Sequence, residues 1–305
     1  MEDQLVDWFK SQARLDPTRF PIGIGDDMAQ INLPSGGSVL VTTDMLLSGV
    51  HFDLSRHSLD QVGYKAMACS LSDCAAMASR PVAAVVAVGL PAGSDPDQLK
   101  LLHRGILKAA QTYDFPLVGG DMTVWRQEDL LAICVAMISI PGPYGVIRRS
   151  GAVVGDMICV TGRLGGSIHG RHMEFVPRVN EAIKLAGMVR IHAMMDLSDG
   201  LASDLPRLCK ESKVGAVVNA TALPISDQAR LSADPIASAL CDGEDFELLF
   251  TISQTDAAAL ARSWDDPLPI TCIGQITAGS DIKIILPSGT IRDLDLRGYD
   301  HFERK

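Results

Sequence analysis

"MMDLSDGLASDL", residues 194–205, combines the end of an apolar run, a turn containing glycine and the start of a helical pattern. It contains three acids, Asp196, Asp199 and Asp204, and neither lysine nor arginine. An ionised carboxylate that is buried without a partner is costly. The acids at the end of this run therefore need a partner from another part of the chain.

Strand-like and helix-like patterns alternate on both sides of this stretch. We expect helices at 2–14, 59–79, 95–113, 177–189 and 201–213, and strands at 38–44, 81–91, 115–121, 130–140, 157–162, 214–223, 246–253 and 269–276. A segment rich in glycine and proline, 141–156, separates the two halves. The sequence thus predicts an α/β or α+β protein with two domains, residues 1–140 and 141–305.

The composition argues against some classes of protein. The 305 residues include 27 basic and 37 acidic residues, which gives a net charge of −10. A protein that binds duplex DNA needs a basic surface, so we expect no nucleic-acid partner. We also expect neither a membrane span nor a signal peptide, because the apolar runs are short and the first residues, "MEDQLVDWFKSQARL", are acidic.

The seven cysteines show no CxxC spacing. We expect them to be buried, reduced thiols, as is typical of a cytoplasmic protein. The methionines at positions 67, 77, 194 and 195 are expected in the core.

Several acids follow apolar residues, glycines or small hydroxyl residues in a similar way. They are Asp26, Asp27, Asp44, Asp73, Asp121, Asp196 and Asp199. Each one alone fits a turn or a helix N-cap. Together they indicate a site, because ligands of such folds bind where strands end. Carboxylates about 4 Å apart repel by roughly 1–4 kcal/mol, and Mg²⁺, which prefers oxygen ligands, would offset that repulsion.

Glycines stand beside these acids in "GIGDD", "GGD" and "SDG". A glycine lets backbone N–H groups come close to an anion. Acids for Mg²⁺ and glycines for phosphate together favour phosphoryl transfer. The chain lacks a GxxxxGK[ST] loop and the HRD and DFG motifs, so it is neither a P-loop enzyme nor a protein kinase.

Eight motifs in order resemble those of the thiamine-monophosphate kinase family, within the aminoimidazole-ribonucleotide synthetase superfamily. They are "GIGDD" (23–27), "TTDMLLSGVHF" (42–52), "GYKAMACSLSDCAAMASRP" (63–81), "GGDMT" (119–123), "RSGAVVGD" (149–156), "DLSDGLASDL" (196–205), "GEDFELLF" (243–250) and "GYDHF" (298–302). The resemblance implies direct Mg²⁺-assisted phosphoryl transfer from ATP to thiamine monophosphate, with several Mg²⁺ ions. It also implies a homodimer in which the N-terminal α/β domain forms a β-barrel with its partner, and a C-terminal α-β-α sandwich.

The resemblance also implies roles for individual residues. The implied metal ligands are Asp27, Thr42, Thr43, Asp44, Asp73, Asp121, Asp196 and Asp199. The implied ATP-binding residues are Tyr113, Gly120, Asp121, Arg149 and Ser198. The implied thiamine-binding residues are His51, Glu244 and Tyr299. Asp27, Asp44, Asp121, Asp196 and Arg149 would be catalytic, whereas we expect Asp204 to be a solvated helix residue.

Some observations keep alternatives open. The segment 163–177 is shorter than is usual in the family, which affects the wall on the substrate side. His169 and His172 are three residues apart, and we expect them to be surface or phosphate-edge residues rather than metal ligands. The alternative functions are an ATP-dependent ligase or cyclase of the same superfamily and an inactive nucleotide-binding regulator.

Overall fold

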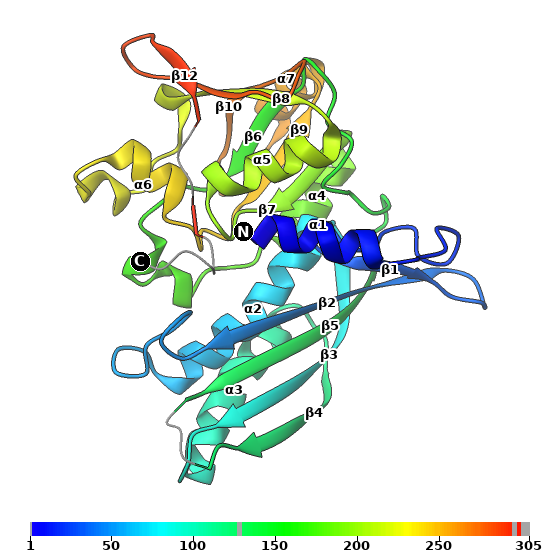
Figure 1. Ribbon diagram of the computed structural model, residues 1–305, viewed down its shortest axis with the longest axis vertical. Coiled ribbons are helices and arrows are strands. Elements are labelled where there is room, and N and C mark those ends of the chain that lie inside the picture. Colours follow the sequence, from blue (N-terminus) through cyan, green and yellow to red (C-terminus); the bar gives the residue numbers. More distant parts are fainter. Residues whose placement is uncertain (1, 127–129, 295–297, 300–305) are drawn as a thin grey trace.

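The computed structural model describes residues 2–126, 130–294 and 298–299. Within these ranges the chain forms two sheets, one from each half of the sequence, which occupy opposite ends of the molecule (Figure 1). The prediction of a mixed α/β protein is confirmed. No helix in the described part of the chain is long and apolar enough to cross a membrane.

The first sheet has five strands in the order β1-β2-β5-β3-β4. Its strands are β1 (Ala29–Asn32), β2 (Ser38–Leu47), β3 (Ser79–Leu90), β4 (Leu117–Val124) and β5 (Ala132–Pro141). Two helices, α2 (Leu59–Ala76) and α3 (Pro96–Thr112), cover one face (Figure 1). Neighbouring pairs of strands are antiparallel except β3 and β4, which are parallel.

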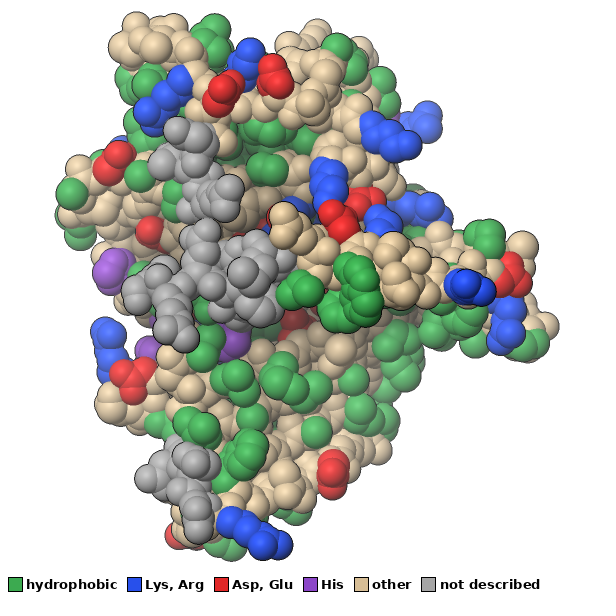
Figure 2. Space-filling view, viewed as in Figure 1, with side chains coloured by type: hydrophobic (Ala, Val, Ile, Leu, Met, Phe, Trp, Pro, Cys, Tyr) green, Lys and Arg blue, Asp and Glu red, His purple; other side chains and the backbone are tan. Residues whose placement is uncertain are grey.

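The other face of this sheet is apolar and exposed. Met45 on β2, Val85 on β3 and Ile138 on β5 are all exposed on this face. In Figure 2 hydrophobic side chains are spread over this half of the molecule. Exposed apolar patches of this kind mark interaction surfaces.

The second sheet has seven strands in the order β12-β11-β8-β10-β6-β9-β7. Its strands are β6 (Met157–Thr161), β7 (Ile191–Asp196), β8 (Gly215–Asn219), β9 (Leu248–Ile252), β10 (Ile270–Thr277), β11 (Ile282–Ile285) and β12 (Ile291–Asp293). Its helices are α4 (Val179–Met188), α5 (Leu201–Ser212), α6 (Pro235–Cys241) and α7 (Gln254–Ser263). Four 3₁₀ turns connect these elements, at Ser167–His169, Arg171–Met173, Ala220–Ala222 and Ala229–Leu231.

This second sheet is covered on both faces. One core cluster joins Phe250 of β9 to Leu185 of α4 and Leu260 of α7. A separate cluster joins Val160 of β6 to Leu205 of α5. These two clusters give the α-β-α layering that was expected for this half.

Helix α2 lies at the junction of the two halves, with contacts to β2 and β5 of the first sheet and to β7 of the second. Its N-terminus is fixed by a capping box between Ser58 and Gln61. A Cβ atom on Gly63 would lie 2.1 Å from the Leu102 carbonyl oxygen, so α2 and α3 cross at a distance that only glycine allows. The buried helix therefore presents its side chains to a defined place between the sheets.

The N-terminal helix α1 (Glu2–Gln12) crosses to the second half of the chain. Lys10 bonds Glu211 at 2.8 Å, Lys210 bonds Asp7 at 2.6 Å and Arg207 bonds Asp3 at 3.1 Å, so three ion pairs join α1 to α5. These pairs are largely exposed, and such pairs each stabilise by at most about 1 kcal/mol.

Candidate functional site

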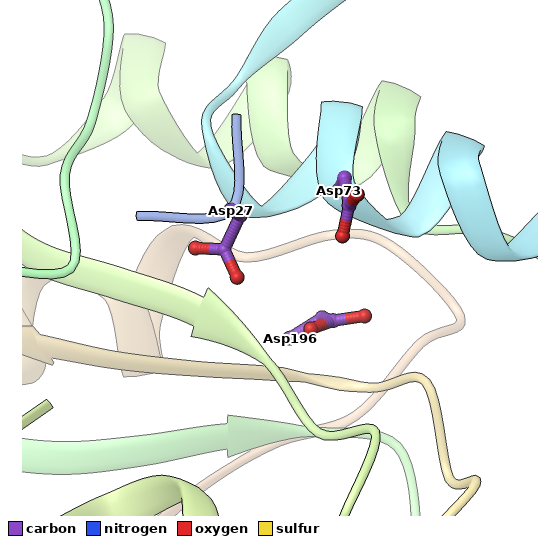
Figure 3. Close-up of side chains that lie close together, drawn as sticks. All are labelled: Asp27, Asp73 and Asp196. Atoms are coloured by element: carbon purple, nitrogen blue, oxygen red, sulfur yellow. The ribbon is translucent and has the colours of Figure 1, made fainter. Parts of the chain in front are cut away.

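Three carboxylates from three different elements converge between the two sheets. Asp27 lies in the turn before β1, Asp73 on α2 and Asp196 at the end of β7 (Figure 3). One oxygen from each lies within 4.8 Å of the others. The structure thus brings acids from both halves of the sequence into one cluster, which we call the three-acid cluster.

Hydroxyl groups donate to these acids. Ser72 donates to Asp196 Oδ2 at 2.5 Å, and Thr42 donates to Asp73 Oδ2 at 2.5 Å. Beside them, Ser70 donates to Asp44 Oδ2 at 2.5 Å. Thr42 and Asp44 both lie on β2 and face α2, so their side chains border the three-acid cluster. A neutral hydroxyl does not cancel a carboxylate charge, so negative charge accumulates here.

Burial, together with the accumulated charge, shifts the pKa values of the acids. Burial, with added repulsion from Asp27, raises the pKa of Asp196 to about 7. Burial, followed by repulsion from Asp44, Asp196 and Asp27, raises the pKa of Asp73 well above its usual range. Burial also raises the pKa of Asp44. The site therefore favours species that neutralise it, either protons or cations.

One arginine reaches the cluster from the segment between the sheets. Arg149 Nη2 bonds Asp27 Oδ1 at 2.6 Å, and its backbone N–H donates to Asp26 at 3.2 Å. Burial and the Asp27 charge raise the pKa of Asp26 to about 7. Among the described residues, Asp27 Oδ2 is buried without a hydrogen-bond partner. An unpartnered carboxylate oxygen beside two further carboxylates is a donor set that suits Mg²⁺.

Asp199 and Asp204 share a different cation. Arg207 on α5 forms ion pairs with both, and the Asp199 backbone N–H donates to Asp204 Oδ2 at 3.1 Å. The expectation that Asp204 is a solvated helix residue is wrong, because its side chain is fully buried. Asp204 faces inward because it fixes the turn between β7 and α5. Asp199 is outside the three-acid cluster in this structure.

A buried lysine supports the expected thiamine-binding residues. Lys65 on α2 is fully buried, and its Nζ donates to the His51 carbonyl oxygen and to Glu244 Oε1, each at 2.6 Å. Lys65 thus joins the loop after β2 to the loop before β9. Sequence reasoning gave it no role, although it lies eight residues before Asp73 on the same face of a predicted helix.

The loop that carries Glu244 has a constrained backbone. Glu244 (φ 52°) and Phe246 (φ 49°) adopt the left-handed conformation, which is uncommon for residues other than glycine. Asp245 holds the loop by accepting from Ser167 Oγ at 2.5 Å and from Arg171 at 2.7 Å. Phe246 stacks on Phe175 with the ring centroids 4.1 Å apart. Glu244 is therefore held in place from both sides.

The remaining expected substrate and phosphate residues lie on the same loops. The Glu244 backbone N–H donates to the Ser198 carbonyl at 2.6 Å, and the Tyr299 N–H donates to the Asp199 carbonyl at 3.0 Å. Ser198, Glu244 and Tyr299 are thus neighbours after β7. The last residues of "GYDHF", 300–302, lie outside the described residues.

Two of the expected nucleotide residues, Gly120 and Asp121, lie apart from the three-acid cluster. Gly120 and Asp121 are exposed on the edge strand β4, beside a groove of about 730 Å³ between β4 and α3. Asp121 pairs with Ala87 on β3, and Asp44 pairs with Val135 on β5. Two strands, β5 and β3, separate the strands of Asp44 and Asp121, so about 14 Å lies between them at the usual strand spacing.

The other predicted residues have local partners. Thr43 faces away from α2, and its hydroxyl lies 3.3 Å from Cys134 Sγ. The Tyr113 hydroxyl donates to the Pro177 carbonyl and so links α3 to the second half of the chain.

The two histidines of the short segment 163–177 differ in burial. His169 is exposed, whereas His172 is buried and burial lowers its pKa to about 4. Among the described residues neither histidine belongs to a metal-binding group.

Comparison with known families assigns both halves. Residues 25–140 match the family described as AIR synthase related protein, N-terminal domain. Residues 155–287 match its C-terminal counterpart, AIR synthase related protein, C-terminal domain. Each match contains one of the two sheets almost completely.

Individual relatives are similar over nearly their whole length. The thiamine-monophosphate kinase of Rhodopirellula baltica is 35% identical over 99% of this chain and 98% of the relative. That of Escherichia coli is 32% identical, with the same coverage. The solved structure "AaThiL complexed with AMPPCP and TMP" is 26% identical with a TM-score of 0.82, covering 98% of this chain and 96% of that one. The thiamine-monophosphate kinase structure from Stenotrophomonas maltophilia is 32% identical with a TM-score of 0.72, covering 92% and 95%. This chain belongs to the thiamine-monophosphate kinase family.

Proposed function

We propose that this chain transfers the γ-phosphoryl group of ATP to thiamine monophosphate and so forms thiamine diphosphate and ADP. The observation that carries the proposal is the three-acid cluster, which lies where the two family domains meet. The donor and the acceptor of this reaction are both anionic. A site with so many carboxylates can hold two anionic substrates only if divalent cations lie between the carboxylates and the phosphates.

Asp27, Asp73 and Asp196 are the proposed first ligands of Mg²⁺, with Asp44 next to them. When bound, Mg²⁺ would neutralise the phosphate oxygens and align donor and acceptor. Arg149 would release part of its bond to Asp27 and contact a phosphate through its planar guanidinium. The acceptor is already a phosphate oxygen anion, so these side chains need to position it rather than deprotonate it.

Thr42, Thr43, Asp121 and Asp199 remain proposed metal ligands. For Asp199, this role requires that a cation replace Arg207 as its partner. We assign Ser198 to the phosphates of ATP, because it lies on the loop directly after Asp196. These assignments rest on the motifs and on proximity along the chain.

The thiamine end of the substrate is assigned to His51, Glu244 and Tyr299. The carboxylate of Glu244 can accept hydrogen bonds from an aminopyrimidine, and Lys65 holds this carboxylate in position. The constrained backbone of Glu244 fits this role, since strained residues gather at ligand sites. The short segment 163–177 supplies Ser167 and Arg171, which anchor this loop from behind.

We further propose a homodimer in which the exposed apolar face of the first sheet pairs with that of a second copy. Met45, Val85 and Ile138 would be buried there, which removes apolar surface from water. Such pairing would build the expected β-barrel from two copies of residues 1–140. Within one chain, Asp121 lies about 14 Å from Asp44. In the dimer, Asp121 of one copy would approach Asp44 of the other copy.

Under this arrangement the nucleotide would bind beside β4 of one copy, near Gly120, Asp121 and Tyr113. Its phosphates would extend to the three-acid cluster of the other copy. A Cβ atom on Gly120 would lie 2.1 Å from the Val86 carbonyl oxygen, so glycine is required here for strand packing in any case. A cytoplasmic location is proposed because ATP is the phosphoryl donor and the seven cysteines are free thiols.

The direct test is to incubate the purified protein with ATP, Mg²⁺ and thiamine monophosphate and to measure thiamine diphosphate by chromatography. We expect product only when all three are present. If the protein forms no thiamine diphosphate but produces ADP when formylglycinamidine ribonucleotide is the substrate, it is instead the ligase or cyclase of the superfamily. Nucleotide binding without turnover of either substrate would identify a regulator.

A further inference from the structure

Two cysteines lie opposite each other in the middle of the seven-stranded sheet. Cys159 on β6 is paired with Cys272 on the antiparallel strand β10. Their Sγ atoms are 3.0 Å apart, although the residues are 113 positions apart in the sequence. A disulfide bond has an S–S length of about 2.05 Å, so the sulfur atoms need to approach by only about 1 Å to bond.

The two thiols differ in access to solvent. Cys159 is fully buried, with Phe250 opposite it on β9, whereas Cys272 is exposed. A reagent in solution therefore reaches Cys272 first. The hydrogen bond donated by Cys159 lowers the pKa of Cys272 to about 7, which increases its thiolate fraction. The geometry thus supplies an accessible attacking thiol and a buried second thiol in contact with it.

We propose that Cys272 and Cys159 are a modification site at which small disulfides, such as oxidised glutathione, form an intramolecular cross-strand disulfide. The Cys272 thiolate attacks one sulfur of the small disulfide, which forms a mixed disulfide and releases one thiolate. Cys159 then attacks Cys272 Sγ, passes its proton to the departing thiolate and releases the second small thiol. In total the protein loses two protons and two electrons, and the small disulfide is reduced to two thiols.

The bond would connect the two central strands of the second sheet. Strand β10 also pairs with β8, and β6 also pairs with β9. A bond between β6 and β10 would therefore connect the β12-β11-β8-β10 part of the sheet covalently to the β6-β9-β7 part. The link would close a long loop and so restrict the unfolded chain. We expect the oxidised protein to unfold at a higher temperature than the reduced protein. This inference is independent of the proposed kinase activity.

The test begins with the reduced wild-type protein under native conditions. The protein is treated with oxidised glutathione, denatured, alkylated with iodoacetamide and analysed by mass spectrometry. We expect two fewer alkylated cysteines than the seven of the reduced control. Trypsin should release a linked pair of peptides, residues 150–163 and 263–283, each of which contains a single cysteine.

Three variants separate the steps. Cys159→Ser should retain a glutathione adduct on Cys272, because no second thiol is present to displace it. Cys272→Ser should leave Cys159 unmodified, because the buried thiol is out of reach. Cys241→Ser, which removes a half-buried thiol elsewhere, should form the linked peptides as the wild type does. The proposal is overturned if wild-type protein keeps a stable adduct on Cys272, or if both peptides remain fully alkylated.

Discussion

Asp196 accepts a hydrogen bond from Ser72 and lies beside two other acids, with neither lysine nor arginine in its own segment. Sequence reasoning predicted that it needs a partner from elsewhere, because the motif is acidic and apolar. It could not predict which residues supply that partner. Ser72 and Asp73 come from α2, more than 120 positions earlier, and only the packing of α2 between the sheets brings them together.

We expect a substitution of Asp196 to lower the activity without lowering the stability of the protein. For Asp196→Asn we expect kcat/KM to fall by about 10²–10³-fold, the scale expected for loss of one transition-state contact. The melting temperature without metal should not fall, because the change removes buried charge repulsion. Steady-state kinetics and thermal unfolding measure both. Near-normal turnover at saturating Mg²⁺ would remove Asp196 from the site.

Lys65 gives a second prediction at this scale. Lys65→Met removes the group that holds Glu244 and the His51 carbonyl. We expect KM for thiamine monophosphate to rise about tenfold or more, which corresponds to at least about 1.4 kcal/mol, while KM for ATP changes little. Lys283→Met is the matched control, because Lys283 lies on β11, its side chain is 41% exposed and it forms an ion pair with Asp281. Equal effects on both KM values would show a general disruption instead.

At the scale of elements, periodicity predicted the parts of the chain with long regular patterns. The helix expected at 59–79 is α2, Leu59–Ala76, and the strand expected at 81–91 is β3, Ser79–Leu90. The short strands β1, β11 and β12 and the helices α6 and α7 were missed, because a short element carries too few residues to show a period. The expectation of buried cysteines was wrong for Cys272, which is exposed, and Cys134 and Cys241 are only partly buried. An apolar run in the sequence does not show which of its residues the neighbouring elements cover.

The three-acid cluster is built by three elements, and its raised pKa values predict how pH affects metal binding. Because the pKa of Asp196 is raised to about 7, the folded protein without metal binds more protons than the unfolded chain between about pH 4 and pH 7. Its free energy of unfolding should therefore fall as the pH rises through this range. Mg²⁺ competes with these protons, so it should stabilise the protein more at about pH 8 than at about pH 5.5.

Thermal unfolding with and without Mg²⁺ at both pH values measures this effect. A Mg²⁺ concentration of about 100 times Kd would add about 2.7 kcal/mol to the free energy of unfolding. Asp73→Asn should lose most of the Mg²⁺-dependent stabilisation. A Mg²⁺ effect of the same size at both pH values would contradict the coupling between protons and metal.

At the scale of the whole molecule, the open sheet face and the position of Asp121 lead to a prediction about two copies. Asp121→Asn and Asp196→Asn homodimers should each be inactive. In a mixed dimer, one site would combine intact Asp196 from one copy with intact Asp121 from the other. We therefore expect unfolding and refolding of an equimolar mixture to restore about a quarter of wild-type activity.

The control for this experiment is each variant refolded alone, which should remain inactive. If both acids act within one chain, every site in the mixed dimer carries one substitution and activity stays absent. The same absence would follow from a protein that remains monomeric, which sedimentation would show.

The most direct measurement is the anomalous scattering of Mn²⁺, used in place of Mg²⁺, in crystals grown with a non-hydrolysable ATP analogue. We predict a peak within bonding distance of Asp27, Asp73 and Asp196, which should disappear in crystals of Asp73→Asn. Peaks confined to other places, with the three carboxylates free of metal while the nucleotide is bound, would contradict the assignment of this cluster as the metal site.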